Sequence, residues 1–116
     1  MRITLPMPPN MANKSFGHWA KKGRARDEYM MLAMVLSQDV KRPSKPFHRA
    51  RISVTLYTWN PMDRDNLTAR LKWPIDFLVE RGFIVDDGPK CLESEMPKQA
   101  IDRKHMRVEI ELEAIA

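Results

Sequence analysis

The sequence predicts a mixed α/β fold (α+β): a small single domain, residues 1–116, in which a mixed β-sheet is combined with two main helices. Three observations predict it: the chain has 116 residues, several segments alternate apolar and polar residues, and two apolar segments have helical composition. Hydrophobic residues make up 43% of the chain and charged residues 30%, which is typical of a folded domain. A chain of this length buries a small core, so a homodimer that covers more apolar surface is open to it.

Alternation along the sequence predicts the strands. Residues 2–7 alternate and stop at Pro8 and Pro9, which predicts a short strand at the edge of a sheet. Residues 51–59 and 108–113 alternate more regularly, so each is expected to bury one face and leave the other in water. The other predicted strands are short: residues 83–85, followed by a turn at 86–89, and a segment near 91–98.

The first predicted helix covers residues 24–40 and follows a loop-like segment at 10–23. It contains neither glycine nor proline, and its run from Tyr29 to Leu36 is apolar and rich in helix formers. Because this helix is apolar nearly all round, we expect it to be deeply buried or to pack against a second subunit. Its methionines are interpreted as core residues rather than functional ones.

The second predicted helix covers residues 66–81. Asp65 or Asn66 is placed to cap its N-terminus, and Gly82 is placed to end it. Pro74 lies inside the helical pattern, where it removes one backbone hydrogen bond. We therefore expect one helix with a kink at Pro74.

The net charge of +5 conceals an uneven distribution along the chain. Residues 1–51 carry a balance of +8, whereas residues 52–116 carry a balance of −3. The basic residues form two clusters, Lys14, Lys21, Lys22, Arg24 and Arg26 with His18 and Trp19 interleaved, and Lys41, Arg42, Lys45, Arg49 and Arg51. Such clusters are typical of polyanion binding, and the first is predicted to contact nucleic acid. Solvated loops and helix faces are the alternative interpretation.

Cysteine content and hydropathy restrict the cellular setting. The one cysteine, Cys91, forms no internal disulfide and supplies no thiolate cluster for a metal. The sequence has no apolar run of the length that a signal peptide or a membrane span needs. We therefore expect a cytoplasmic protein with no membrane partner.

Carboxylates flank two predicted element boundaries. Asp63 and Asp65 lie where a strand leads into the second helix, and Asp87 follows the next short strand. A turn into the helix can direct Asp63 and Asp65 toward one point, and Mg²⁺ prefers such oxygen ligands. In a continuous helix, Lys72 and Asp76 fall within about 20° of the line of Asp65. Lys72 is then placed to hold a phosphate or to offset developing charge.

These residues also have purely structural interpretations, which spacing alone leaves open. Asp65 can serve as a helix cap, and residues 86–88 can form an ordinary turn. Lys72 and Asp76 can form a surface ion pair one helical turn apart.

The combined motif resembles the RusA family of Holliday junction resolvases, in particular its phage-encoded members. The matching residues are Asp63-x-Asp65-Asn66-Leu67, Lys72-x-x-x-Asp76-x-Leu78, Gly82 and Asp86-Asp87, with Leu5-Pro6-Met7-Pro8-Pro9, Asn13 and His18-Trp19 near the start. The stretch between Asn66 and Lys72 is about three residues longer than the compact family motif, and Phe77 stands where a small residue is usual. With a matching order of elements, the resemblance covers most of the chain.

The resemblance implies a homodimeric Mg²⁺-dependent endonuclease, with Mn²⁺ as a substitute, that makes paired nicks in four-way DNA junctions during recombination and repair. It assigns Asp63, Asp65 and Asp87 to the metal and Lys72 to catalysis. Asp76, Asp86 and Asn66 are expected to support these residues from nearby. The apolar helix with Met30, Met31, Met34 and Val35 is the expected dimer contact.

Two other functions remain open from the sequence. One is a protein that binds branched nucleic acid without cutting it, in which the acids serve as caps and turns. The other is a phage accessory protein whose basic half meets an acidic protein surface.

Overall fold

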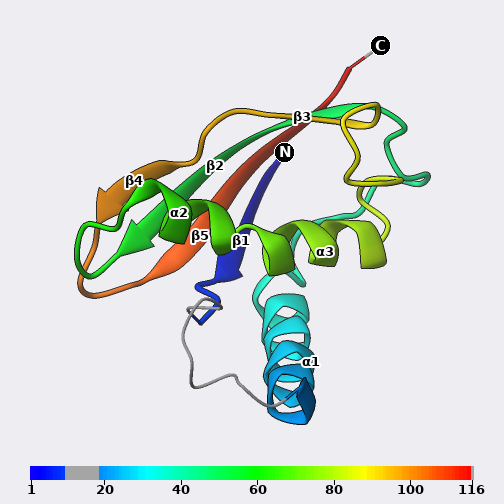
Figure 1. The fold of residues 1–116 in the computed structure, drawn as a ribbon. Helices are drawn as coiled ribbons and strands as arrows, with labels where there is room; N and C mark the ends of the chain where they lie inside the picture. Colours follow the sequence, from blue (N-terminus) through cyan, green and yellow to red (C-terminus); the bar gives the residue numbers. More distant parts are fainter. Residues whose placement is uncertain (10–18, 116) are drawn as a thin grey trace.

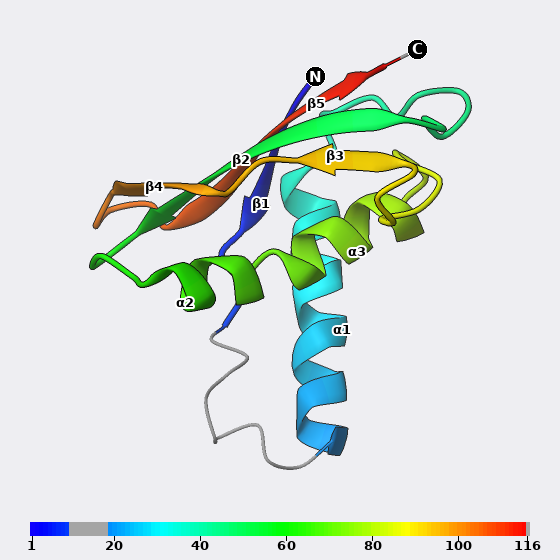
Figure 2. The same ribbon diagram turned by 45° about the horizontal axis from the view of Figure 1, so that its top comes forward.

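The chain folds as an α+β domain in which helices cover one face of a mixed β-sheet (Figures 1 and 2). The computed structural model describes residues 1–9 and 19–115, except for the side chains of residues 19–22. The elements in chain order are β1 (Arg2–Pro6), α1 (Trp19–Leu36), β2 (Ala50–Thr58), α2 (Arg64–Ala69), α3 (Lys72–Glu80), β3 (Leu92–Ser94), β4 (Lys98–Ile101) and β5 (Arg107–Ala114).

The sheet has the order β1-β5-β2-β3, and β4 continues beside β2 along the same edge as β3. β5 pairs antiparallel with both β1 and β2, whereas β3 and β4 run parallel to β2. The predictions of an edge strand at residues 2–7, a strand at 51–59 and a strand around 108–113 are confirmed. β1 lies at the edge and makes its ladder with β5.

The segment predicted as one strand near residues 91–98 is two short strands. Ile52 of β2 pairs with Ser94, and Thr55 pairs with Lys98. The edge segment therefore contains one more residue than β2 between these pairs. Pro97 lies in this interruption, because a proline has no N–H to donate to a ladder.

The core lies between the helices and the inner face of the sheet, as the alternation predicted. The sheet contributes Ile3, Leu5, Ile52, Val54, Leu56, Val108, Ile110 and Leu112, each at most 4% exposed. From α3, Trp73, Phe77 and Leu78 pack onto them. Burial of this apolar surface is the main stabilising contribution to the fold.

The segment predicted as one kinked helix at residues 66–81 is two helices, α2 and α3. The cap prediction is also wrong, because Asp63 caps α2 with its Oδ1 accepting from the Asn66 N–H at 2.9 Å. Pro74 cannot donate to the carbonyl of Arg70, and its ring would clash with that carbonyl. The break at Arg70 and Leu71 places Pro74 in the first turn of α3, where proline is tolerated.

Helix α1 begins at Trp19, within the predicted loop, and ends at Leu36. The expectation of deep burial and of a methionine core is wrong for most of its residues. Met31 is 66% exposed and Val35 is 55% exposed, whereas Tyr29 and Ala33 are buried. The reason is the course of α1, which crosses α3 and extends away from the sheet, so that one narrow side meets the core (Figure 2).

After α3 the chain turns at Gly82, which ends the helix as predicted and has a φ of 81°. Residues 83–85 form a single parallel bridge rather than a strand. Phe47 donates its N–H to the Phe83 carbonyl at 3.0 Å, and Val85 donates to the Phe47 carbonyl at 3.0 Å. Because Phe47 and Ile84 are the single bridged pair here, the segment is too short to form a strand with a ladder of pairs.

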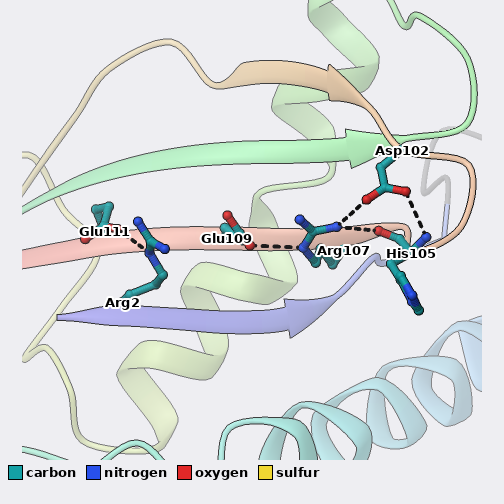
Figure 3. A network of polar contacts seen from close by, with 6 residues as sticks. All are labelled: Arg2, Asp102, His105, Arg107, Glu109 and Glu111. Carbon is teal, nitrogen blue, oxygen red and sulfur yellow. Dashed lines mark hydrogen bonds and ion pairs between the residues drawn. The ribbon is translucent and has the colours of Figure 1, made fainter.

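The outer face of the sheet carries rows of opposite charges (Figure 3). Arg2 pairs with Glu111 at 2.6 Å, and Arg107 pairs with Asp102 at 2.8 Å and Glu109 at 3.0 Å. Hydrogen bonds from Arg107 and from backbone N–H groups lower the pKa of Asp102. The predicted wet face of β5 is confirmed, and its charges are largely compensated within the chain.

Within the described residues, no helix has the length and apolar character needed to cross a membrane.

Candidate functional site

The first group of predicted site residues lies where β2 leads into α2. Asp63, Asp65 and Asn66 occupy the cap and first turn of α2, and both carboxylates are exposed. The Asp63 carboxylate accepts a hydrogen bond from the Asn66 N–H and so caps α2. The sequence had left this capping role open for Asp65. Asp65 adds a negative charge near the helix N-terminus, where it is favourable.

The loop before Asp63 is held by Gln99 of β4, a residue that sequence reasoning missed. Its Nε2 donates to Thr58 Oγ1 at 2.7 Å and to the Asn60 carbonyl at 3.1 Å, and its Oε1 accepts from the Met62 N–H at 3.2 Å. One amide side chain thus ties the end of β2 to the residue before the cap. Only the pairing of β4 with β2 shows this role, and no sequence signal marks it.

A second anchor for this loop comes from the connection between β4 and β5. Arg103 donates from Nε to the Trp59 carbonyl at 3.3 Å, and its guanidinium carbon lies 5.5 Å from the centroid of the Trp59 ring. Trp59 is 51% exposed, so the cation and the aromatic ring together form part of the surface next to Asp63.

The second group of predicted site residues lines a groove between the helices and β3. Lys72 and Asp87 both face this groove, which has a volume of about 580 Å³. Its other lining residues are Thr68, Ala69, Leu71, Ile75, Leu92 and Ser94. The structure thus brings together the predicted catalytic lysine and one predicted metal ligand, on a largely apolar floor.

The two adjacent aspartates after residues 83–85 differ in environment. Asp87 lines the groove, whereas Asp86 folds back toward Gly88. A Cβ added at Gly88 would lie 3.1 Å from Asp86 Oδ2, so the glycine gives this carboxylate room. Of the pair, Asp87 is the one placed to act with Lys72.

Lys72 belongs to a chain of charges that joins α3 to α1. Its Nζ lies 3.7 Å from Asp76 Oδ2, and Arg26 reaches the same oxygen at 3.6 Å and Glu80 Oε1 at 2.7 Å. The predicted alignment of Asp65 with Lys72 and Asp76 is wrong, because the break between α2 and α3 interrupts the helical spacing. Lys72 and Asp76 do form the ion pair one helical turn apart that their structural interpretation predicted, and the supporting role of Asp76 stays a prediction.

Arg70 ties the junction of α2 and α3 to the end of β1. Its Nη1 donates to the Pro8 carbonyl at 3.0 Å, and burial lowers the pKa of its guanidinium. Its Nε is buried and makes no hydrogen bond within the part of the chain described here. This contact fixes the position of the chain just before residue 10.

The predicted nucleic-acid contacts of the first basic cluster are described only in part. Lys14 and His18 lie outside the described residues, and Trp19, Lys21 and Lys22 belong to α1 without described side chains. Arg24 is exposed. Arg26 makes ion pairs with Asp76 and Glu80, so part of its charge is compensated within the chain.

The predicted metal ligands have suitable chemistry but are not assembled. Asp63, Asp65 and Asp87 present exposed carboxylate oxygens, which Mg²⁺ prefers. Within the described residues, however, no three His, Cys, Asp or Glu side chains lie close enough to hold a metal ion. The assignment of these three carboxylates to a metal therefore stays a prediction.

Neither a scan of protein-family models nor a search of curated proteins finds a match to this chain.

Proposed function

We propose that the protein is a Mg²⁺-dependent endonuclease that cuts four-way DNA junctions by paired nicks, as the resemblance to the RusA family implies. The observation that supports the proposal most is that Lys72 and Asp87 line the same groove. Helix α2, which carries the Asp63-x-Asp65-Asn66 motif at its N-terminal end, also contributes to this groove. When bound, magnesium supplies an activated water and stabilises the leaving oxygen.

The residues of the chain have separable parts in this proposal. Lys72 is 66% exposed at its side chain, so its ammonium can meet a phosphate at the groove without a large desolvation cost. Asp76 Oδ2 lies 3.7 Å from this ammonium and pairs with it by charge, and Lys72 also lines the groove that Asp87 lines. Gln99 fixes the loop that sets the position of Asp63, so the carboxylates of α2 start from a defined backbone.

The direct test is to incubate the protein with a synthetic four-way junction or a matched linear duplex, in Mg²⁺ or in EDTA. We expect symmetric incision of the junction in Mg²⁺, none in EDTA, and little cutting of the duplex. Denaturing gels of end-labelled strands give the position of each nick. Binding of the junction without incision in Mg²⁺ or Mn²⁺ would refute the nuclease.

That outcome would favour the second candidate function, a protein that binds branched nucleic acid without cutting it. One observation favours this candidate: the Asp63 carboxylate caps α2, and the described carboxylates do not form a cluster of three. In a binding protein, these acids need serve only as caps and turns.

Paired cutting requires two copies of the chain. We also propose that these copies associate through the exposed apolar side of α1. Its exposed residues are Met31, Leu32, Met34, Val35 and Leu36. We expect a dimer in solution at micromolar concentration, measured by light scattering. The double variant Met31→Glu, Val35→Glu should weaken association by about 100-fold or more, because it places unpaired charges in an apolar contact.

The control is Met96→Glu, since Met96 is 43% exposed between β3 and β4, on the sheet edge opposite β1, and should leave the dimer unchanged. A wild-type chain that stays monomeric at high concentration, or a double variant that dimerises normally, would contradict this contact.

A further inference from the structure

A groove lined by cations lies between the end of α3 and the segment that joins α1 to β2. It has a volume of about 480 Å³. Its described lining residues are Lys41, Arg42, Pro43, Ser44, Pro46, Arg81 and Gly82, and none of them is acidic. This groove, called here the basic groove, is separate from the groove that Lys72 and Asp87 share.

The two walls of the basic groove are held together by backbone and side-chain contacts. Arg42 Nη1 donates to the Arg81 carbonyl at 3.2 Å, which joins one wall to the other. Just beyond the groove, the Phe47 N–H donates to the Phe83 carbonyl at 3.0 Å. Proline at position 46 further restricts the backbone of this segment. The groove therefore exists before any ligand binds, which lowers the entropic cost of binding.

The structure divides the second basic cluster of the sequence into two parts. Arg51 lies on the outer face of the sheet, where it pairs with Glu113 at 2.9 Å and with Glu93 at 3.2 Å. Lys41, which belongs to this cluster, faces the basic groove together with Arg81, which follows α3. Neither makes an ion pair within the described residues.

The nearest acid along the chain does not neutralise the groove. Glu80 precedes Arg81, but its Oε1 is bonded to Arg26 at 2.7 Å. The carbonyl at the end of α3 carries a partial negative charge, and Arg42 offsets it by donating to it. Lys41 and Arg81 thus retain their positive field for an external anion.

We propose that the basic groove binds two neighbouring backbone phosphates of a DNA arm, one at Lys41 and one at Arg81. This inference rests on the proposed function and adds a contact outside the candidate catalytic residues. Lys41 and Arg81 supply the charge, and the Ser44 hydroxyl supplies a hydrogen-bond donor. Such a contact positions the duplex without reading its sequence. On the outer face of the sheet the arginines are paired with glutamates, so that face is expected to attract phosphate less than the basic groove does.

The test compares the salt dependence of junction binding for the wild type, Lys41→Gln with Arg81→Gln, and a charge-matched control. The control, Arg2→Gln with Arg51→Gln, removes the same two charges from the outer face of the sheet, where both pairs are exposed. Binding of a labelled four-way junction is measured by fluorescence anisotropy in EDTA between about 50 and 300 mM salt. Affinity that depends on phosphate contacts changes strongly over this range. Circular dichroism confirms that each variant is folded.

We expect the groove variant to lower the slope of log K against log salt concentration by about two, one per lost phosphate contact. At 0.1 M salt this corresponds to roughly 50-fold weaker binding. The control should keep the wild-type slope, and at saturating protein it should cut the junction at the wild-type rate.

The possible failures are distinguishable. If the wild type binds and cuts junctions while the groove variant keeps its full slope, or the control loses as much, the basic groove is overturned and the nuclease stands. If the groove variant alone loses slope but no protein cuts, the groove is supported and the nuclease is refuted. Absence of any DNA binding by the wild type overturns both.

Discussion

Asp65→Asn should lower the rate of Mg²⁺-dependent junction cutting by about 10³-fold or more, the scale on which loss of one member of a catalytic unit lowers kcat. The substitution keeps the shape of the side chain and removes the charge that a divalent cation needs. Junction binding should be preserved or become tighter, because a carboxylate that repels phosphate is lost. Single-turnover cutting and anisotropy measure the two effects separately.

The matched control is Asp27→Asn, which makes the same chemical change at an exposed position of α1. Helix α2 should survive Asp65→Asn, because the capping hydrogen bond comes from Asp63 and the lost charge–dipole term is only about 0.3–1 kcal/mol. A variant that cuts at the wild-type rate would show that Asp65 holds no metal.

Trp73→Ala should lower the free energy of unfolding by about 3–5 kcal/mol, a large part of the roughly 5–15 kcal/mol of a typical domain. The Trp73 side chain is 2% exposed, and its ring centroid lies 5.7 Å from that of Tyr29 at an angle of 46°. This pair joins α3 to α1, so its loss leaves a cavity between the two helices. Urea unfolding followed by circular dichroism gives the change.

The same substitution at Trp59, which is 51% exposed, is the control and should cost about 1 kcal/mol or less, the scale of an exposed cation–π contact. If Trp73→Ala does not fold, Trp73→Phe provides the measurement, since it retains most of the apolar volume. Equal stability losses at the two positions would contradict the packing of α3 against the core.

Strands were predictable from the sequence wherever one face is buried. Ile52, Val54 and Leu56 alternate with polar residues because the inner face of β2 meets the helices, and the burial follows that alternation. The split edge strand was not predictable, because β3 and β4 are short and their partner is β2, about 40 residues earlier in the sequence.

Helices were predictable in type but less so in extent and burial. Pro74 marked a disruption, but whether a proline bends a helix or begins a new one depends on tertiary packing, here around Leu71. The apolar run of α1 indicated a buried helix, whereas among the described residues of α1 only Tyr29 and Ala33 are buried. The sequence of an apolar segment does not show whether its side chains pack in the core of one chain or in a contact between two chains.

The sequence indicated where in the fold the candidate site residues lie, but it did not predict how they are arranged relative to one another. The carboxylates at the start of α2 and after residue 85 do occupy loop ends, and Asp87 shares a groove with Lys72. Their distances depend on the break between α2 and α3, which spacing in a continuous helix cannot describe. Gln99 was beyond prediction, because its role exists only once β4 lies beside β2.

The pairing of β1 with β5 has a consequence for the order in which the protein matures. Ile3 pairs with Ile110, so β1 has its ladder partner about 100 residues later in the sequence. Translation at about 5–20 residues per second leaves the apolar side chains of β1 waiting for several seconds beside a growing chain. Completion of this sheet therefore waits until β5 has been synthesised, and the apolar face of β1 is vulnerable to aggregation until then.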